Sequence, residues 1–131
     1  MWYNFEGNDT NRVLDLSNRY TDGNLYGGQR VAGKFSQSLQ LLPSESIQIS
    51  GDDFSFNQTF TVSMWTKVLD DSQGIILQNS QMRIEYRDNL KFYGSIYSGN
   101  DWQEIGSDFI QGQWIHLGLT LDSSQLKIYK R

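Results

Sequence analysis

The sequence of 131 residues contains no cysteine and a single proline. Without thiols the chain can form neither disulfides nor thiolate metal sites, which excludes the small cystine-rich secreted class. Basic residues are also few: 15 acidic side chains stand against 11 basic ones, and this balance argues against a nucleic-acid partner. No apolar run approaches the roughly 20 residues that span a bilayer, so we expect no membrane insertion.

Aromatic residues and glycines are what the sequence has in quantity, at 14% and 12 residues respectively. Aromatic rings suit the pleated surface of a β-sheet, and glycine supplies the positive φ angles of tight turns. The chain is long enough to bury a core without disulfides or metals. We therefore predict one all-β domain over residues 1–131.

Two stretches show the clearest strand pattern, FTVSMWTKV at 60–68 and WIHLGLTLD at 114–122. In the first, Phe60, Val62 and Met64 share one face, so Trp65 should lie on the opposite face unless a bulge intervenes. Short strands at spacings of about 8 to 12 residues predict a two-sheet antiparallel sandwich. A long loop is expected over 15–28, and further strands are expected at 2–5, 31–33, 38–42, 46–49, 74–78, 82–87, 90–97, 102–105 and from 126 onward.

Five stretches of the sequence follow one another in a characteristic order: WYNF at 2–5, DLSNRYTDGNL at 15–25, FTVSMWTK at 60–67, WIHL at 114–117 and LKIY at 126–129. Together they resemble the laminin-G/pentraxin-like jelly rolls of the concanavalin A-like lectin/glucanase superfamily. In that family the strand similar to LKIY leads into further strands, so we expect a jelly-roll sandwich that is incomplete at its C-terminal edge. The chain is then either a fragment of a longer domain or a partner in a homo- or hetero-oligomer formed through unpaired sheet edges.

Trp102 is the best candidate for a carbohydrate-binding residue. It lies in the loop-flanked stretch SGNDWQE with Asn100, Asp101 and Glu104, and Tyr97 lies just before this stretch. Aromatic faces stack on pyranose rings, while amides and carboxylates bind the hydroxyl groups. The alternative is that Trp102 caps the end of the sandwich core. The other tryptophans are expected in the core or between strands: Trp2, Trp65 and Trp114.

Oxygen-rich loops supply candidate ligands for Ca²⁺, which takes about six to eight oxygen ligands. Asp15, Asp22 and Asn24 lie in one such loop, and Asp52 and Asp53 lie in another. Members of the family that the sequence resembles often bind Ca²⁺ near loops of this kind. The alternative is that Asp15 and Asp22 accept hydrogen bonds from nearby backbone N–H groups and shape the loop.

No catalytic pattern is found in the sequence. Retaining glucanases need two carboxylates about 5 to 5.5 Å apart, which a strand can present as E-x-D-x-x-E, and this pattern is absent. The single histidine, His116, has no cysteine partner, and no Gly-x-Ser-x-Gly elbow occurs. We therefore expect a protein that is not an enzyme, in which His116 has a structural role.

A non-catalytic sandwich of this family is expected to act in recognition, as a lectin-like or adhesion module that binds a glycan or a protein surface. The alternative is a structural component, such as a decoration or fibre domain of a virion or cell-surface assembly, which is completed by or packed against other chains. Both roles predict an extracellular, cell-surface or virion location.

Overall fold

The computed structural model describes residues 1–50, 59–70, 72–123 and 125–131, and the chain divides into two compact units, 1–53 and 54–131. The described residues form twelve strands and no helix, which confirms the all-β class. Within this part of the chain, then, no helix is long and apolar enough to cross a membrane. A single domain over residues 1–131 stays a prediction, and each unit is described by itself.

The first unit contains a three-stranded antiparallel sheet and a separate hairpin. The sheet has the order β1-β2-β5, formed by Arg12–Val13, Gly23–Tyr26 and Ser46–Ile49. The hairpin pairs β3 (Gln29–Ala32) with β4 (Gln37–Gln40).

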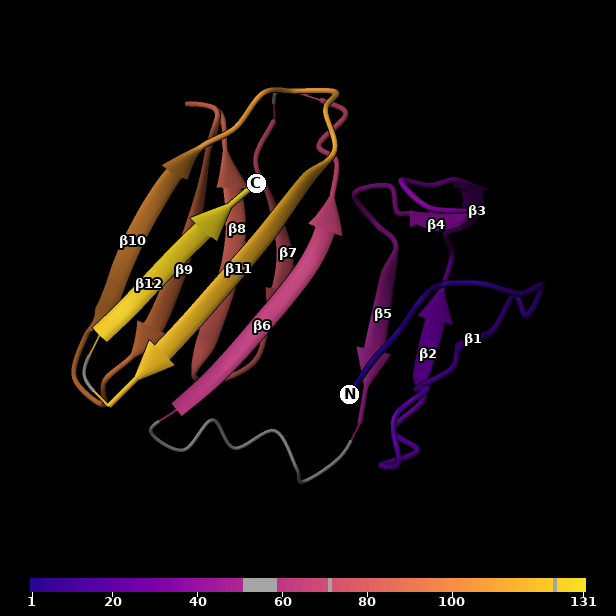
Figure 1. The fold of residues 1–131 in the computed structure, drawn as a ribbon, viewed down its shortest axis with the longest axis horizontal. Helices are drawn as coiled ribbons and strands as arrows, with labels where there is room; N and C mark the ends of the chain where they lie inside the picture. Colours follow the sequence, from indigo (N-terminus) through magenta and orange to yellow (C-terminus); the bar gives the residue numbers. More distant parts are fainter. Residues whose placement is uncertain (51–58, 71, 124) are drawn as a thin grey trace. The chain divides into compact units, whose positions relative to one another are not determined.

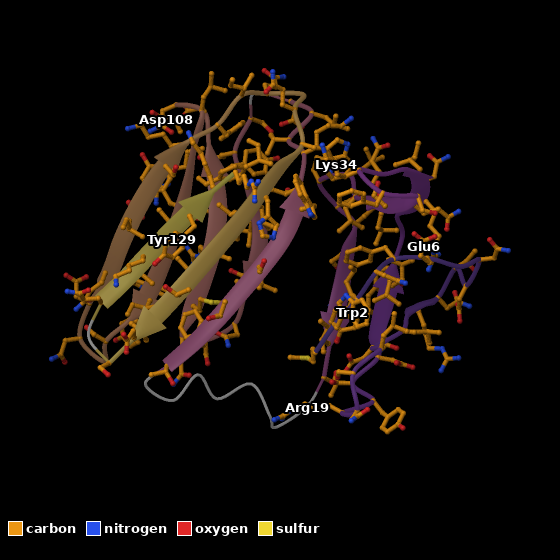
Figure 2. The ribbon with its side chains drawn as sticks, viewed as in Figure 1. Trp2, Glu6, Arg19, Lys34, Asp108 and Tyr129 are labelled. Atoms are coloured by element: carbon orange, nitrogen blue, oxygen red, sulfur yellow. The ribbon has the colours of Figure 1, made fainter. Side chains whose placement is uncertain are left out.

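Polar contacts fix the segment before β1 within the first unit. The guanidinium of Arg30 donates hydrogen bonds to the carbonyl oxygens of Phe5, Asp9 and Arg12. The carboxylate of Glu6, labelled in Figure 2, accepts hydrogen bonds from the Ser36 hydroxyl and the Gln37 N–H. Each of these contacts joins residues at least 18 positions apart in the sequence, which is why a local strand pattern does not reveal them.

Two antiparallel sheets make up the second unit (Figure 1). One has four strands in the order β10-β9-β8-β7, and the other has three in the order β12-β11-β6. The four strands are Trp102–Asp108, Lys91–Tyr97, Met82–Arg87 and Gly74–Gln78. The three strands are Gln125–Lys130, Ile115–Asp122 and Thr59–Thr66.

The core of the second unit lies between its two sheets. Phe92 is fully buried on β9, and Met82, Ile84, Leu117 and Leu119 are each 1% exposed. These side chains come from alternate positions of strands in both sheets, as the period of two in a half-buried strand requires. The predicted two-sheet antiparallel sandwich is therefore confirmed, and it is formed by residues of the second unit.

Gly94 of β9 faces the side chain of Leu119 of β11 across the core. A Cβ atom added at Gly94 would lie 2.3 Å from Cδ1 of Leu119, well inside the contact distance of two carbon atoms. Glycine at position 94 therefore leaves the space that the Leu119 side chain occupies.

The strand predictions hold for most of the second unit and fail near the start of the chain. The ranges 74–78 and 82–87 coincide with β7 and β8, and β6 alternates without a bulge, so Trp65 lies on the face opposite Met64 as predicted. No strand forms at 2–5, where Phe5 has a φ of 60° and Trp2 is 63% exposed, so the predictions of a strand and of a packed Trp2 are wrong. The predicted loop at 15–28 contains β2.

Candidate functional site

The outer face of the four-stranded sheet, turned away from the core, carries aromatic and charged side chains. Antiparallel pairing places directly opposed residues on one face, and the register aligns Trp102 with Tyr97 and Glu104 with Ser95. We call this surface the aromatic face. It consists of Arg83, Glu85 and Arg87 on β8, Tyr93, Ser95 and Tyr97 on β9, and Trp102 and Glu104 on β10.

Trp102 and Tyr97 form an aromatic pair at one end of this face. Their ring centroids are 5.5 Å apart with an angle of 47° between the planes, and the residues are 39% and 44% exposed. The guanidinium carbon of Arg83 lies 5.2 Å from the Trp102 ring centroid, within the range of a cation–π contact. The exposure of both rings favours a surface platform over the alternative in which Trp102 caps the core.

Arg87, the last residue of β8, links several side chains of the aromatic face. Its guanidinium binds both carboxylate oxygens of Glu104, contacts Glu85 at 2.5 Å, and lies 3.8 Å from the Tyr93 ring centroid. The hydrogen bonds to Glu104 raise the pKa of Arg87 above its usual value; those to Glu85 add to the effect, while partial burial opposes it. This network fixes the side chains around Tyr93, whose hydroxyl accepts a hydrogen bond from the Asn89 amide at 2.7 Å.

The remaining predicted sugar-binding residues lie in the hairpin turn between β9 and β10. The carboxylate of Asp101 accepts a hydrogen bond from the backbone N–H of Trp102 at 2.8 Å, and Asn100 is exposed in the turn. The structure therefore groups Trp102, Tyr97 and Glu104 on one sheet face and places Asn100 and Asp101 at its end.

Sequence reasoning missed Arg83 and Arg87 as members of this group. The alternation in 82–87 indicates that Arg83 and Arg87 share the exposed side of their strand. The alternation does not show how β8 pairs with β9. The observed pairing sets Glu85 opposite Tyr93 and so brings these charged side chains beside the aromatic ones.

Asp15 is the centre of the loop that was predicted to hold Ca²⁺. It is 6% exposed, and its carboxylate accepts hydrogen bonds from the N–H of Trp2 and from both the N–H and the hydroxyl of Ser17 and Thr21. Burial alone would raise the pKa of Asp15, but these hydrogen bonds together hold the pKa well below its usual range.

The other predicted ligands do not converge on Asp15. One carboxylate oxygen of Asp22 accepts a hydrogen bond from the N–H of Asp15 at 2.9 Å, and the other lies 3.8 Å from the Arg12 guanidinium. Asn24 is exposed on β2. In the part of the chain that the structure describes, no three His, Asp or Glu side chains gather where a metal ion could bind. This loop fits the alternative in which Asp15 and Asp22 accept hydrogen bonds and shape the loop better than it fits a Ca²⁺ site. Asp52 and Asp53 lie outside the described residues.

His116 lies on the outer face of the three-stranded sheet. Its Nε2 atom is 2.8 Å from the Ser63 hydroxyl, and its ring centroid is 5.1 Å from that of Trp65. Trp65 is 38% exposed on this face. Trp114, just before β11, is half-buried, and the Lys67 ammonium lies 5.4 Å from its ring centroid.

The second unit is thus a two-sheet sandwich that presents aromatic rings and paired charges on an outer sheet face. The family model for the concanavalin A-like lectin/glucanase superfamily matches residues 43–130, more than half of the chain. The chain belongs to this superfamily, as the resemblance in the sequence indicated. Neither the curated proteins nor the solved structures contain a match. Membership supports a carbohydrate-binding or adhesion role in general.

Proposed function

We propose that this protein is a non-catalytic carbohydrate-binding module whose ligand lies on the aromatic face. The observation that carries the proposal is the Trp102–Tyr97 pair, two partly exposed rings 5.5 Å apart on neighbouring strands. An exposed aromatic ring does not contribute the stability that it would add if it were buried in the core. Amphipathic aromatic residues at a surface are typical of binding sites.

The residues around the pair supply the polar half of a sugar site. A pyranose ring presents C–H groups on its face, which pack on an aromatic ring, and hydroxyl groups at its edge, which need hydrogen-bond partners. Arg83 has five N–H donors in its guanidinium, beside the Trp102 ring. Its Nη1 atom lies 3.6 Å from a carboxylate oxygen of Glu85, a contact that holds the guanidinium next to the platform. Glu104 is a further polar group on the same face, whereas Ser95 is only 5% exposed and donates to it.

The arrangement of carboxylates supports binding without hydrolysis. Glu85 and Glu104 of the aromatic face are both bound to the guanidinium of Arg87. A glycosidase needs one carboxyl group that delivers a proton to the glycosidic oxygen and a second that acts on the anomeric carbon or on water. Two carboxylates that share one guanidinium are held in an ion-pair network instead.

The test is a glycan array followed by calorimetry with any oligosaccharide that binds. We expect the Trp102→Ala variant to lose at least about fivefold in affinity, since stacking on one aromatic ring contributes roughly 1 kcal/mol or more. Trp2→Ala is the matched control, because Trp2 is exposed in the first unit and distant in sequence from the aromatic face. Equal affinity of the two variants would contradict the proposal, and release of reducing sugar would show that the protein is an enzyme.

An array without signal would favour the structural role instead. In that case size-exclusion chromatography with light scattering should show regular multimers of the chain. A monomer that binds no glycan would leave a protein surface as the expected partner of the aromatic face.

A further inference from the structure

The outer face of the three-stranded sheet contains a glycine that packing does not explain. Gly118 lies in the middle of β11, the central strand, where glycine weakens a sheet. A Cβ atom at Gly118 would meet nothing nearer than 3.7 Å, which is ordinary contact, and its φ is not positive. Gly94 and Gly106 differ, because a Cβ there would lie 2.3 Å from Leu119 and 3.1 Å from the Tyr93 ring.

The register surrounds this glycine with groups that suit a sugar ring. Gly118 pairs with Ser63 of β6 on one side and with Tyr129 of β12 on the other. Tyr129 is 54% exposed, and Figure 2 labels it on the sheet that faces the viewer. Two residues along β11, His116 pairs with Trp65, so aromatic side chains border the glycine on two sides. A glycine inside a strand often marks a place where a ligand approaches the backbone closely.

Positive charges flank Tyr129 on this face. Lys127 and Arg131 are two residues before and after it, so they share its side of β12 at roughly 7 Å along the strand. Neither has a carboxylate opposite it: Lys127 pairs with Thr120, and Arg131 exchanges backbone hydrogen bonds with His116. The chain as a whole has a net charge of −4, so a cationic strip around an exposed ring is a local feature. It is complementary to an anionic ligand.

We propose that this face is a second binding site, which takes an anionic glycan. A pyranose that carries a carboxylate or sulfate group lies over Gly118 against the Tyr129 ring, and Lys127 and Arg131 bind its charge. The Ser63 hydroxyl and the His116 imidazole, 2.8 Å apart, hydrogen-bond to its hydroxyl groups. This site is on the other sheet from the aromatic face and does not depend on it.

Calorimetry on the full chain tests the proposal with four probes. Oligogalacturonate carries carboxylates only, a carrageenan oligosaccharide carries sulfates only, a neutral agarose oligosaccharide is the uncharged control, and oligothymidylate is a polyanion that is not a glycan. We expect at least one anionic oligosaccharide to bind, with an affinity that falls as salt is raised, and the neutral one to bind at least about tenfold more weakly.

Variants of this face identify the site. Gly118→Val should abolish binding while leaving the melting temperature equal or higher, because a Cβ at this position meets only ordinary contacts and valine favours strands. Tyr129→Ala and Lys127→Ser should each weaken binding about five- to tenfold. These two variants also carry the test if Gly118→Val fails to fold. Lys91→Ser is the matched loss of charge on the four-stranded sheet, where Lys91 pairs with Asp108, and should change nothing.

Three results would overturn the proposal. The first is that neither anionic oligosaccharide binds. The second is that binding survives in a folded Gly118→Val variant or in the Tyr129→Ala and Lys127→Ser variants. The third is that oligothymidylate binds as tightly as the glycans and with the same losses in the variants, which would make the strip a general polyanion surface.

Discussion

Replacing Gly94 by alanine tests how the two sheets of the second unit pack. The new methyl group would lie 2.3 Å from Cδ1 and 3.1 Å from Cδ2 of Leu119, so the leucine would have to move. Leu119 is 1% exposed and has no open space to enter. Overpacking of this kind costs about 1 to 3 kcal/mol. Replacing glycine also reduces the conformational freedom of the unfolded chain, which stabilises the folded protein by about 0.4 to 1 kcal/mol. We therefore expect a net loss of stability of about 1 to 2 kcal/mol.

Gly118→Ala is the matched control for this substitution. Both glycines lie in inner strands of their sheets, but a Cβ at Gly118 meets only ordinary contacts. The same gain from the unfolded state should therefore stabilise Gly118→Ala by about 0.4 to 1 kcal/mol. The two single variants should shift the melting temperature in opposite directions, by about 3 to 6 °C for each kcal/mol at this chain length.

A double-mutant cycle measured by urea unfolding completes the test. Leu119→Ala alone should cost about 2 to 5 kcal/mol because it leaves a cavity in the core. In the Gly94→Ala/Leu119→Ala variant the new methyl group fills part of that cavity, so the double variant should be more stable than the sum of the single losses by at least about 0.5 kcal/mol. Strict additivity, or equal tolerance of alanine at positions 94 and 118, would refute the packing of Gly94 against Leu119.

The remaining predictions concern the core, the Asp15 loop and the aromatic face. Phe92→Ala should cost about 3 to 5 kcal/mol in urea unfolding, because Phe92 is fully buried and its ring stacks on Phe109 at 4.5 Å. The pKa of Asp15 is lowered in the folded state, so the stability that its carboxylate contributes is present above about pH 4 and lost as the pH falls below that value. The Asp15→Asn variant should therefore be less stable than the unmodified protein at about pH 7, and it should lose less stability between about pH 7 and about pH 3. Neither Ca²⁺ nor EDTA should shift the melting temperature, since the Asp15 oxygens are occupied by protein donors, and a clear rise with Ca²⁺ would contradict this. Arg87→Met should cost no more than about 1 kcal/mol, because the ion pairs are partly exposed, but should weaken glycan binding on the aromatic face.

The sequence predicted the strands of the second unit well because their burial alternates. β7 and β8 match the predicted ranges, and the separation of Met64 from Trp65 follows from the period of two alone. In the first unit the predicted range 46–49 coincides with β5, and the ranges 31–33 and 38–42 overlap β3 and β4. The strand predicted at 2–5 is wrong, because side-chain contacts shape that irregular segment. The Arg30 contacts to three carbonyl oxygens span more than 15 residues of sequence, which no local pattern encodes.

The candidate site was predictable only in part, for a similar reason. Trp102 and Tyr97 were found because aromatic residues beside a polar turn indicate a platform. Their neighbours come from β8, and strand register determines which side chains meet across a sheet. The surface around Gly118 was missed altogether, since its features become visible only when Tyr129 and Ser63 are known to lie on either side of it.

The most direct measurement of the central claim is heteronuclear NMR of the tryptophan indole groups during titration with an oligosaccharide identified on the array. The chain has four tryptophans, so their indole N–H signals can be assigned by single substitutions. Binding on the aromatic face predicts that the Trp102 signal shifts with the ligand concentration while that of Trp2 stays in place. A titration in which the oligosaccharide binds and the Trp102 signal does not move would contradict binding on the aromatic face.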